Sequence, residues 1–365
     1  MKDITQIDPR FLTSVQLDRN SVTAYDVTLP PFSVHGLLLP QDENDRFRRL
    51  PEEVAAATNP GVLELHANTA GGRVRFVTDA SVIGICAVMP RLCRASHFAL
   101  SGSCGFDLYA AKTDGSGVHH VQTFLPPYDM TDTYTGVYRC AGGEMTEYTL
   151  NFPLYSDVSS LYVLLSKGAT VGAPRPYRVQ TPVVYYGSSI TQGGCASRPG
   201  NAYQSMIARR LDCDFVNLGF SGSACGETVI ADYIAGLSMS AFVMDYDHNA
   251  PDVAHLAATH APMFARIRAE NLTLPIICVS RPDYFFCPAE CEPRRQVIEK
   301  TVRDAVVAGD RYVSFVDGRD FAAQFGAGDC ISVDGCHPND LGFFCMAIRL
   351  GTELAHWIGQ NELTE

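Results

Sequence analysis

Ser189 and His337 are two residues whose types could together cleave an acyl bond. A serine hydroxyl is a poor nucleophile until a base takes its proton, and histidine is the usual base. Asp334 lies three positions before His337, so one tight turn could bring its carboxylate to the imidazole and fix the tautomer. The three residues predict acyl transfer, with Ser189 as nucleophile, His337 as base and Asp334 as the acid that orients it.

Acyl transfer also needs hydrogen-bond donors for the negative charge that develops on the substrate oxygen, worth about 3–4 kcal/mol each. Gly222 in NLGFSGSA could offer a backbone N–H, because glycine allows close approach. Asn249 in DYDHNAP could offer a side-chain amide. Each piece alone also fits a plain turn, loop or structural histidine, but their joint occurrence favours the catalytic interpretation.

The segments around these residues predict a parallel sheet. Continuous apolar strands are expected at 182–187, 215–219, 241–246, 275–280 and 312–317, separated by helix-length segments. A last helix should run from about Asp340 to Trp357. Such alternation gives a sheet covered by helices on both faces, with reactive groups at the carboxyl ends of the strands. The candidate nucleophile and donors follow strand ends, and His337 precedes the last helix.

Four blocks in this order, YYGSSITQG, NLGFSGSA, DYDHNAP and SVDGCHPNDLG, resemble those of the SGNH (GDSL-like) hydrolases over residues 180–360. The resemblance implies a flavodoxin-like α/β/α sandwich without metal or organic cofactor. It also implies the catalytic residues named above. The oxyanion hole would be formed by the Ser189 and Gly222 N–H groups and the Asn249 amide.

The sequence departs from that family's pattern at three positions. Ser188 stands where Asp is usual, Asp247 where Gly is usual, and Ala250 where Asp is usual. Ser188, Asp247 and His248 could therefore shape the acyl pocket or could simply pack. An α/β-hydrolase is disfavoured, because Thr191 occupies the last position of the G-x-S-x-G elbow. No P-loop motif is present.

Short strands with Gly- and Asp-rich turns fill the first half of the chain and predict a β-sandwich. They are expected at 73–78, 81–88, 97–102, 106–111, 119–125, 147–154 and 160–166. Residues 172–182, with three prolines, are interpreted as a linker. The predicted domains are residues 1–175, the sandwich, and residues 176–365, the hydrolase.

CGFDLYAA resembles the GxDLY signature of a β-sandwich domain found ahead of some SGNH esterases. The resemblance places Asp107 or Tyr109 near the mouth of the site, where it would hold substrate. The favoured alternative is that Tyr109 packs and Asp107 caps a turn. Arg281, just after the strand at 275–280, could bind a substrate carboxylate or sugar hydroxyl, or pair with Asp283 or Asp247.

The chain has 28 Lys and Arg and 40 Asp and Glu, a formal net charge of −12, which disfavours nucleic acid as a partner. The basic cluster Arg46, Arg48 and Arg49 is interpreted as a solvated face of mixed charge. The 13 cysteines are expected to be reduced, and the spacing of Cys287 and Cys291 does not favour zinc. With no signal peptide or membrane segment visible, a cytoplasmic location is expected.

The expected function is hydrolysis of short acyl, favouring acetyl, esters on carbohydrate, because a β-sandwich joined to an SGNH domain resembles carbohydrate esterases. The partner is then a small-molecule or oligosaccharide ester. An acyltransferase with the same triad is the main alternative, and a glycan-binding module with an inactive hydrolase domain is a third. Acyl length, alcohol, homo-oligomer formation and hydrolysis versus transfer remain open at this point.

Overall fold

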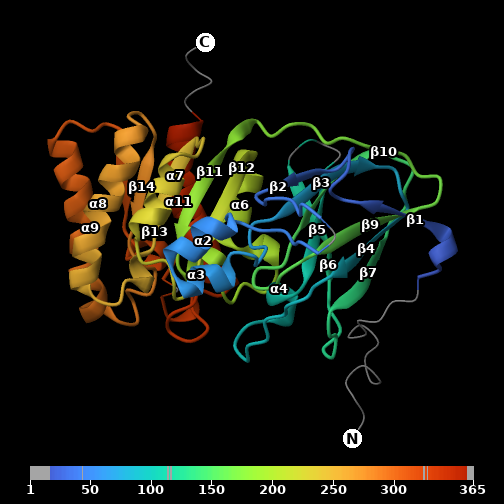
Figure 1. The fold of residues 1–365 in the computed structure, drawn as a ribbon, viewed down its shortest axis with the longest axis horizontal. Helices are drawn as coiled ribbons and strands as arrows, with labels where there is room; N and C mark the ends of the chain where they lie inside the picture. Colours follow the sequence, from blue (N-terminus) through green and yellow to red (C-terminus); the bar gives the residue numbers. More distant parts are fainter. Residues whose placement is uncertain are drawn as a thin grey trace, which may run out of the picture.

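The computed structural model describes residues 17–42, 44–112, 115, 117–323, 325–326 and 328–359. Its second half contains a parallel sheet of five strands in the order β12-β11-β13-β14-β15. In chain order the strands are β11 (Val179–Gly187), β12 (Cys213–Gly219), β13 (Ala241–Asp245), β14 (Ile276–Val279) and β15 (Val313–Val316). Each neighbouring pair is parallel, which confirms the predicted sheet (Figure 1).

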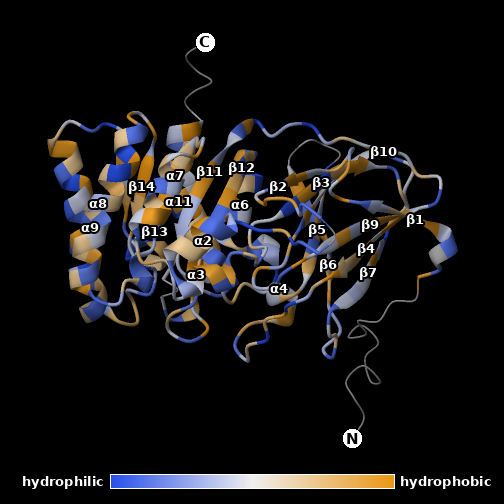
Figure 2. Ribbon diagram, viewed as in Figure 1, coloured by the Kyte–Doolittle hydropathy of each residue, from blue (hydrophilic) through white to orange (hydrophobic). Residues whose placement is uncertain are grey.

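Helices cover both faces of this sheet. α6 (Tyr203–Leu211) and α11 (Asp340–Ile358) share one hydrophobic cluster with it. α7 (Thr228–Ala235), α8 (Val253–Glu270) and α9 (Pro288–Val307) share the other. β13 and β14, inside the sheet, are buried at every position, and Figure 2 shows their mainly apolar residues in orange. The result is the expected flavodoxin-like sandwich.

Two antiparallel sheets form the first half of the chain, in the orders β1-β9-β4-β7 and β10-β3-β8-β5-β6, with β2 paired to β3. Their side chains share a third core, so they pack as a sandwich. The strands are β1 (Val22–Asp26), β2 (Ser33–His35), β3 (Arg73–Thr78), β4 (Val82–Val88), β5 (Phe106–Ala111), β6 (Val118–Phe124), β7 (Thr133–Arg139), β8 (Thr146–Asn151), β9 (Ser160–Ser166) and β10 (Val171–Gly172).

Short helices complete the described part of the chain. They are α2 (Glu52–Thr58), α3 (Pro60–Leu65), α4 (Leu100–Ser103), α5 (Ser189–Gln192) and α10 (Asp320–Ala323). Short 3₁₀ helices span Arg19–Ser21, Pro199–Asn201, Asp247–Asn249 and Gly328–Cys330. Along the described stretches, no helix has both the length and the apolar character needed to cross a bilayer.

Two sequence predictions about elements were wrong. The strand expected at 97–102 is instead a loop leading into α4, which packs against the second half: a Cβ at Gly102 would lie 2.0 Å from the Ala196 carbonyl oxygen. The linker expected at 172–182 overlaps two strands. β10 ends at Gly172, and β11 already begins at Val179, where it pairs with Cys213.

α2 and α3 join the first half of the chain to the second. Leu50, Ala55 and Val62 belong to the same buried cluster as Ile230 of α7. Figure 1 shows the two helices, in blue, lying beside the parallel sheet. The division at residue 175 remains a prediction, and the cores on its two sides are connected through this helix pair.

Candidate active site

Ser189 begins α5, directly after the carboxyl end of β11. The Ser188 hydroxyl caps this short helix by accepting a hydrogen bond from Ile190 N at 3.1 Å. Serine can therefore replace the family's usual Asp here, because either side chain supplies the capping oxygen. The turn is tight: a Cβ at Gly187 would lie 2.1 Å from Thr191 Oγ1. Ser188 is buried and so belongs to the turn.

The structure brings Ser189, His337 and Asp334 together. Ser189 Oγ lies 3.0 Å from His337 Nε2, and His337 Nδ1 lies 2.8 Å from Asp334 Oδ2. Asp334 Oδ1 also accepts the backbone N–H groups of Cys336, at 3.0 Å, and His337, at 2.7 Å. These two bonds form the tight turn that holds the carboxylate beside the ring. The arrangement favours a proton on Nδ1 and leaves Nε2 to accept the serine proton.

Electrostatics around His337 involve a cysteine as well as the carboxylate. Partial burial raises the pKa of Asp334, but the hydrogen bonds from His337 and from the turn outweigh it and lower that pKa to about 2. A hydrogen bond with Cys336 is the largest effect that raises the pKa of His337. Burial lowers this pKa and Asp334 raises it further, so that the pKa of His337 is about 9. Burial raises the pKa of Cys336, but hydrogen bonds with His248 and His337 lower it to about 7.

The predicted oxyanion donors lie on a turn that is tied to the nucleophile. Phe220 N donates to Gly187 O at 2.8 Å, and Ser221 N donates to Gln192 Oε1 at 3.0 Å. Gly222 has φ +65 and is exposed. Its N–H has no acceptor within the described residues. Asn249 Nδ2 donates to Phe220 O at 2.8 Å, so this amide also braces the turn. Both oxyanion roles stay predictions.

Residues of the sandwich half reach the nucleophile, and sequence reasoning missed them. The Tyr155 hydroxyl donates to Ser189 O at 3.1 Å. Gln192 Nε2 donates to Asn68 Oδ1 at 3.0 Å, which connects the turn of Gly222 to the sandwich. The ring of His97 lies 5.8 Å from that of His337. No motif marks these residues, because their roles come from contacts between distant segments.

The residues proposed for the rim form a compact ionic network. Asp247 is buried and accepts hydrogen bonds from Arg281 N, at 3.1 Å, and from Arg294 Nη1, at 3.3 Å. Arg281 Nε donates to Asp283 Oδ1 at 2.7 Å, and its Nη2 lies 2.5 Å from Asp283 Oδ2. The structural alternative therefore fits Asp247 and Arg281 better than substrate binding. His248 Nε2 lies 3.2 Å from Asp283 Oδ2.

Cys287 and Cys291 extend this network, with their sulfurs 3.5 Å apart. Together with Asp283 they place three ligand-type atoms within 4.8 Å of one another. Arg281 already forms ion pairs with both carboxylate oxygens of Asp283. Burial raises the pKa of both thiols. This donor set suits a guanidinium rather than a metal ion.

Asp107 and Tyr109 do not reach the mouth of the site as substrate ligands would. Asp107 is fully buried on β5, where its Oδ2 accepts Arg198 Nη1 and Gly200 N, both at 2.9 Å. Asn151 Nδ2 donates to its other oxygen at 2.7 Å. Arg198 also donates to the Tyr109 hydroxyl. The GxDLY-like segment thus fastens the loop at 197–201, and these contacts fit the favoured alternative, in which Asp107 holds a turn and Tyr109 packs, better than substrate binding.

Arg49 corrects the interpretation of the basic cluster. Its side chain is buried, not solvated, and donates to the carbonyl oxygens of Leu65, at 2.7 Å, and Asn68, at 2.6 Å. It also donates to Asn217 O, at 3.3 Å, and Gly219 O, at the end of β12. Arg48 pairs with Asp45 and Glu52, as a face of mixed charge would, whereas Arg46 pairs with the buried Asp157.

Comparisons with known proteins agree with the geometry. Residues 180–353 match the GDSL-like lipase/acylhydrolase family, and residues 23–171 match the GxDLY N-terminus of SGNH-hydrolase-type esterases. No curated protein matches the chain significantly.

Three solved structures share the fold over 93% of this chain and nearly all of their own. A protein of Bacteroides ovatus assigned to the GDSL-like lipases is 25% identical, and the match covers 98% of its chain with a TM-score of 0.81. The salicylyl-acyltransferase SsfX3 of a tetracycline biosynthetic pathway is 19% identical, and the match covers 98% of its chain with a TM-score of 0.74. The acetyl xylan esterase Est2A of the rumen bacterium Butyrivibrio proteoclasticus is 12% identical, and the match covers 99% of its chain with a TM-score of 0.56.

The last two likenesses, below 25% identity, concern the fold alone. The two family matches are adjacent and together span both halves of the structure. The chain is therefore an ester hydrolase that belongs to the GDSL-like lipase/acylhydrolase family through its second half and carries the GxDLY N-terminal domain of SGNH-type esterases.

Proposed function

We propose that this esterase removes short acyl groups, acetyl above all, from carbohydrate, through an acyl-enzyme on Ser189. The observation that carries the proposal is the continuous contact from Ser189 Oγ to His337 Nε2, at 3.0 Å, and from His337 Nδ1 to Asp334 Oδ2, at 2.8 Å. This is the arrangement that activates a serine hydroxyl toward an ester carbonyl.

The reaction has two halves. Ser189 Oγ attacks the ester carbonyl carbon while its proton passes to His337 Nε2. The N–H groups of Ser189 and Gly222 and the Asn249 amide stabilise the oxyanion. His337 returns the proton to the leaving alcohol oxygen as the ester C–O bond breaks. Water then attacks the acyl-enzyme and gives a proton to His337. That proton returns to Ser189 Oγ as the carboxylic acid leaves.

Crowding around the nucleophile supports a short acyl group. Ser189 is only 8% exposed. A Cβ at Gly194 would lie 3.0 Å from both Ser189 O and the Tyr155 hydroxyl, and 3.4 Å from His337 Cδ2. Side chains and backbone thus enclose the serine closely on this side. A long acyl chain would have to leave by another path.

A carbohydrate substrate is supported by aromatic surface beside the triad and by the shared fold of the acetyl xylan esterase. Phe286 is 37% exposed, and its ring lies 3.9 Å from a Cβ built on Gly335, in the turn between Asp334 and His337. A sugar ring can pack its apolar face on such a side chain while its hydroxyls remain hydrated.

The first experiment compares hydrolysis of p-nitrophenyl acetate, butyrate and octanoate by the wild type, Ser189→Ala and the matched control Ser240→Ala. We expect acetate to be preferred, at least a 10³-fold loss of kcat in Ser189→Ala, and full activity in Ser240→Ala. Release of acetate from acetylated xylan by the wild type tests the carbohydrate. Activity that survives in Ser189→Ala, with folding intact, would sink the mechanism.

An acyltransferase remains the second candidate, because the acyl-enzyme is the same and the salicylyl-acyltransferase shares the fold with a TM-score of 0.74. The two functions differ only in whether water or another alcohol takes the acyl group. Adding millimolar sugars or alcohols to the ester assay separates them. An ester product that outweighs free acid would assign the chain as a transferase.

A further inference from the structure

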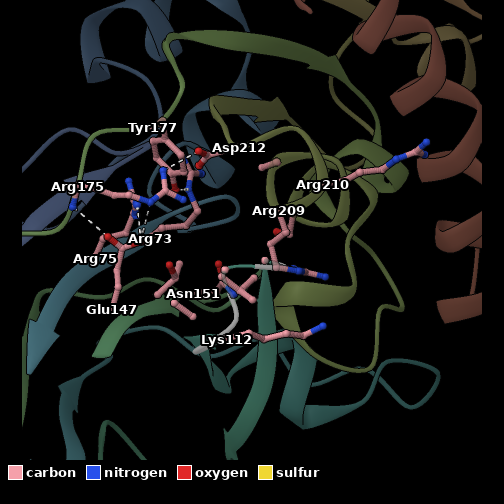
Figure 3. A pocket seen from close by; sticks show the side chains of 17 residues that line it. Arg73, Arg75, Lys112, Glu147, Asn151, Arg175, Tyr177, Arg209, Arg210 and Asp212 are labelled. Atoms are coloured by element: carbon pink, nitrogen blue, oxygen red, sulfur yellow. Dashed lines mark hydrogen bonds and ion pairs between the residues drawn. The ribbon is translucent and has the colours of Figure 1, made fainter. Parts of the chain in front are cut away.

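A basic cavity lies where the sandwich meets α6, apart from the triad. Its volume is about 570 Å³. Figure 3 shows its wall, which is formed by the sheet of β3, β5 and β8, the segment at 175–177 and α6. Among the described residues, six cationic and two acidic side chains line it: Arg73, Arg75, Lys112, Arg175, Arg209 and Arg210, with Glu147 and Asp212. Such a surplus of positive charge is unexpected in a chain of net charge −12.

Acidic neighbours neutralise only part of this charge. Arg75 Nη2 lies 2.8 Å from Glu147 Oε1, and Arg175 Nη1 lies 2.6 Å from Asp212 Oδ2. Arg73 pairs with Asp214 just outside the cavity. Within the part of the chain that the structure describes, neither Lys112 nor Arg209 forms an ion pair. The cavity therefore keeps an unbalanced positive charge.

Two buried guanidinium nitrogens at the wall lack an acceptor. Arg75 is 2% exposed, and its Nη1 has no hydrogen-bond partner among the described residues; the same holds for Arg209 Nη1. Tyrosine rings hold both groups in place, Tyr177 at 4.0 Å from Arg75 Cζ and Tyr109 at 4.2 Å from Arg209 Cζ. Buried donors normally have partners, so these two guanidinium groups keep hydrogen-bonding capacity that the described residues do not use.

We propose that this cavity binds an acidic sugar, meaning a hydroxyl-bearing ligand with a carboxylate or phosphate. Arginine forks match both anions, and polar side chains of Thr149, Asn151 and Ser205 in the same wall can meet hydroxyls. A cavity of about 570 Å³ falls in the range of small-molecule sites.

The site is separate from the ester chemistry. Asp212 lies in the wall of the cavity and directly precedes Cys213, which pairs with Val179 at the start of β11. Ser189 lies at the opposite end, just after β11 ends. A strand of 9 residues spans about 30 Å at roughly 3.3 Å per residue. A ligand here would hold the two halves together at a distance from the acyl group. The proposal does not depend on the esterase substrate.

Calorimetric titration of the full chain at low ionic strength tests it, with D-glucuronate, glucose 6-phosphate, inorganic phosphate and glucose as probes. We expect at least one acidic sugar to bind and glucose not to bind. Arg209→Gln and Lys112→Gln should each weaken binding at least tenfold. The control Arg303→Gln removes the same charge from an exposed position on α9, outside the cavity lining, and should change affinity less than twofold.

The source of the ligand follows from which anion binds more tightly: glucuronate indicates an acidic polysaccharide, and glucose 6-phosphate a sugar phosphate. Absence of binding by both acidic sugars would overturn the proposal. So would equal losses in Arg209→Gln and Arg303→Gln, or inorganic phosphate binding as tightly as glucose 6-phosphate. Esterase activity with p-nitrophenyl acetate reports folding of each variant. If Arg209→Gln does not fold, the exposed Lys112 decides the outcome.

Discussion

In the proposed mechanism His337 acts as a base only while its imidazole is neutral, so the groups that hold its proton should control the pH at which the esterase works. Asp334 is the expected neighbour, but Cys336 contributes more to the raised pKa of about 9. The Cys336 sulfur also lies 3.5 Å from His248 Nε2. The Cys336 thiol therefore connects His337 to the ionic network of His248 and Asp283.

Cys336→Ser should shift the pH profile. Because protonated His337 cannot accept the Ser189 proton, kcat/KM is lost as the pH falls through the pKa of His337. Removing the thiol removes the largest contribution that raises this pKa. The acid limb of kcat/KM should therefore move to lower pH by roughly one unit, toward the ordinary histidine value. Initial rates with p-nitrophenyl acetate between pH 5 and 10 measure it. Cys330→Ser, at an exposed cysteine, is the control. Identical acid limbs in the wild type, Cys336→Ser and Cys330→Ser would refute the coupling of Cys336 to His337.

At the scale of elements, the turn after β12 depends on the first half of the chain. Gln192, at the end of α5, contacts both sides: its Nε2 donates to Asn68 Oδ1 at 3.0 Å, and its Oε1 accepts Ser221 N at 3.0 Å. Asn68 in turn donates to Asp157 Oδ1 at 2.8 Å. The donor of Gly222 is thus positioned through a buried polar chain that begins in the sandwich.

Gln192→Met tests this positioning. Methionine fills similar space but cannot bond Ser221 or Asn68, so the turn of Gly222 should loosen. We expect kcat to fall about 10- to 100-fold with little change in KM, because the donors act mainly in the transition state. The exposed Gln296→Met serves as the matched control. A rise in KM with kcat unchanged would instead place Gln192 in ground-state binding.

Sequence patterns predicted the parallel sheet, the long helices and the contact of Ser189, His337 and Asp334, because each depends on local order: continuous apolar runs, helical length and one tight turn. They could not predict Tyr155 beside Ser189, or the burial of Arg49, because those positions are fixed by contacts across more than thirty residues of chain. The loop at 97–99, the helix α4 and the pairing of Asp107 with Arg198 were missed for the same reason, because each lies where the two halves meet.

For the whole molecule, the contact between the halves combines apolar packing with a buried polar part. Arg49 from the first half donates to Asn217 O and Gly219 O in β12, and Asp107 receives Arg198 and Gly200 from the second. Such contacts fix orientation more strictly than apolar packing does, because each donor needs one particular acceptor. The same interface supplies Tyr155 and Asn68 to the catalytic turns, so its geometry and the activity should change together.

Asp107→Asn should therefore cost both stability and activity. The substitution keeps the shape of the side chain but leaves Arg198, whose side chain is 22% exposed, without its ion pair, at a cost of about 1.5–3 kcal/mol. Urea unfolding followed by circular dichroism measures the loss. The surface variant Asp129→Asn is the control. Because Arg198 belongs to the loop whose Ser197 binds Asp340 at the start of α11, kcat/KM should fall in the folded variant as well. A stable Asp107→Asn protein with full activity would show that the GxDLY-like segment does not hold the two halves in register.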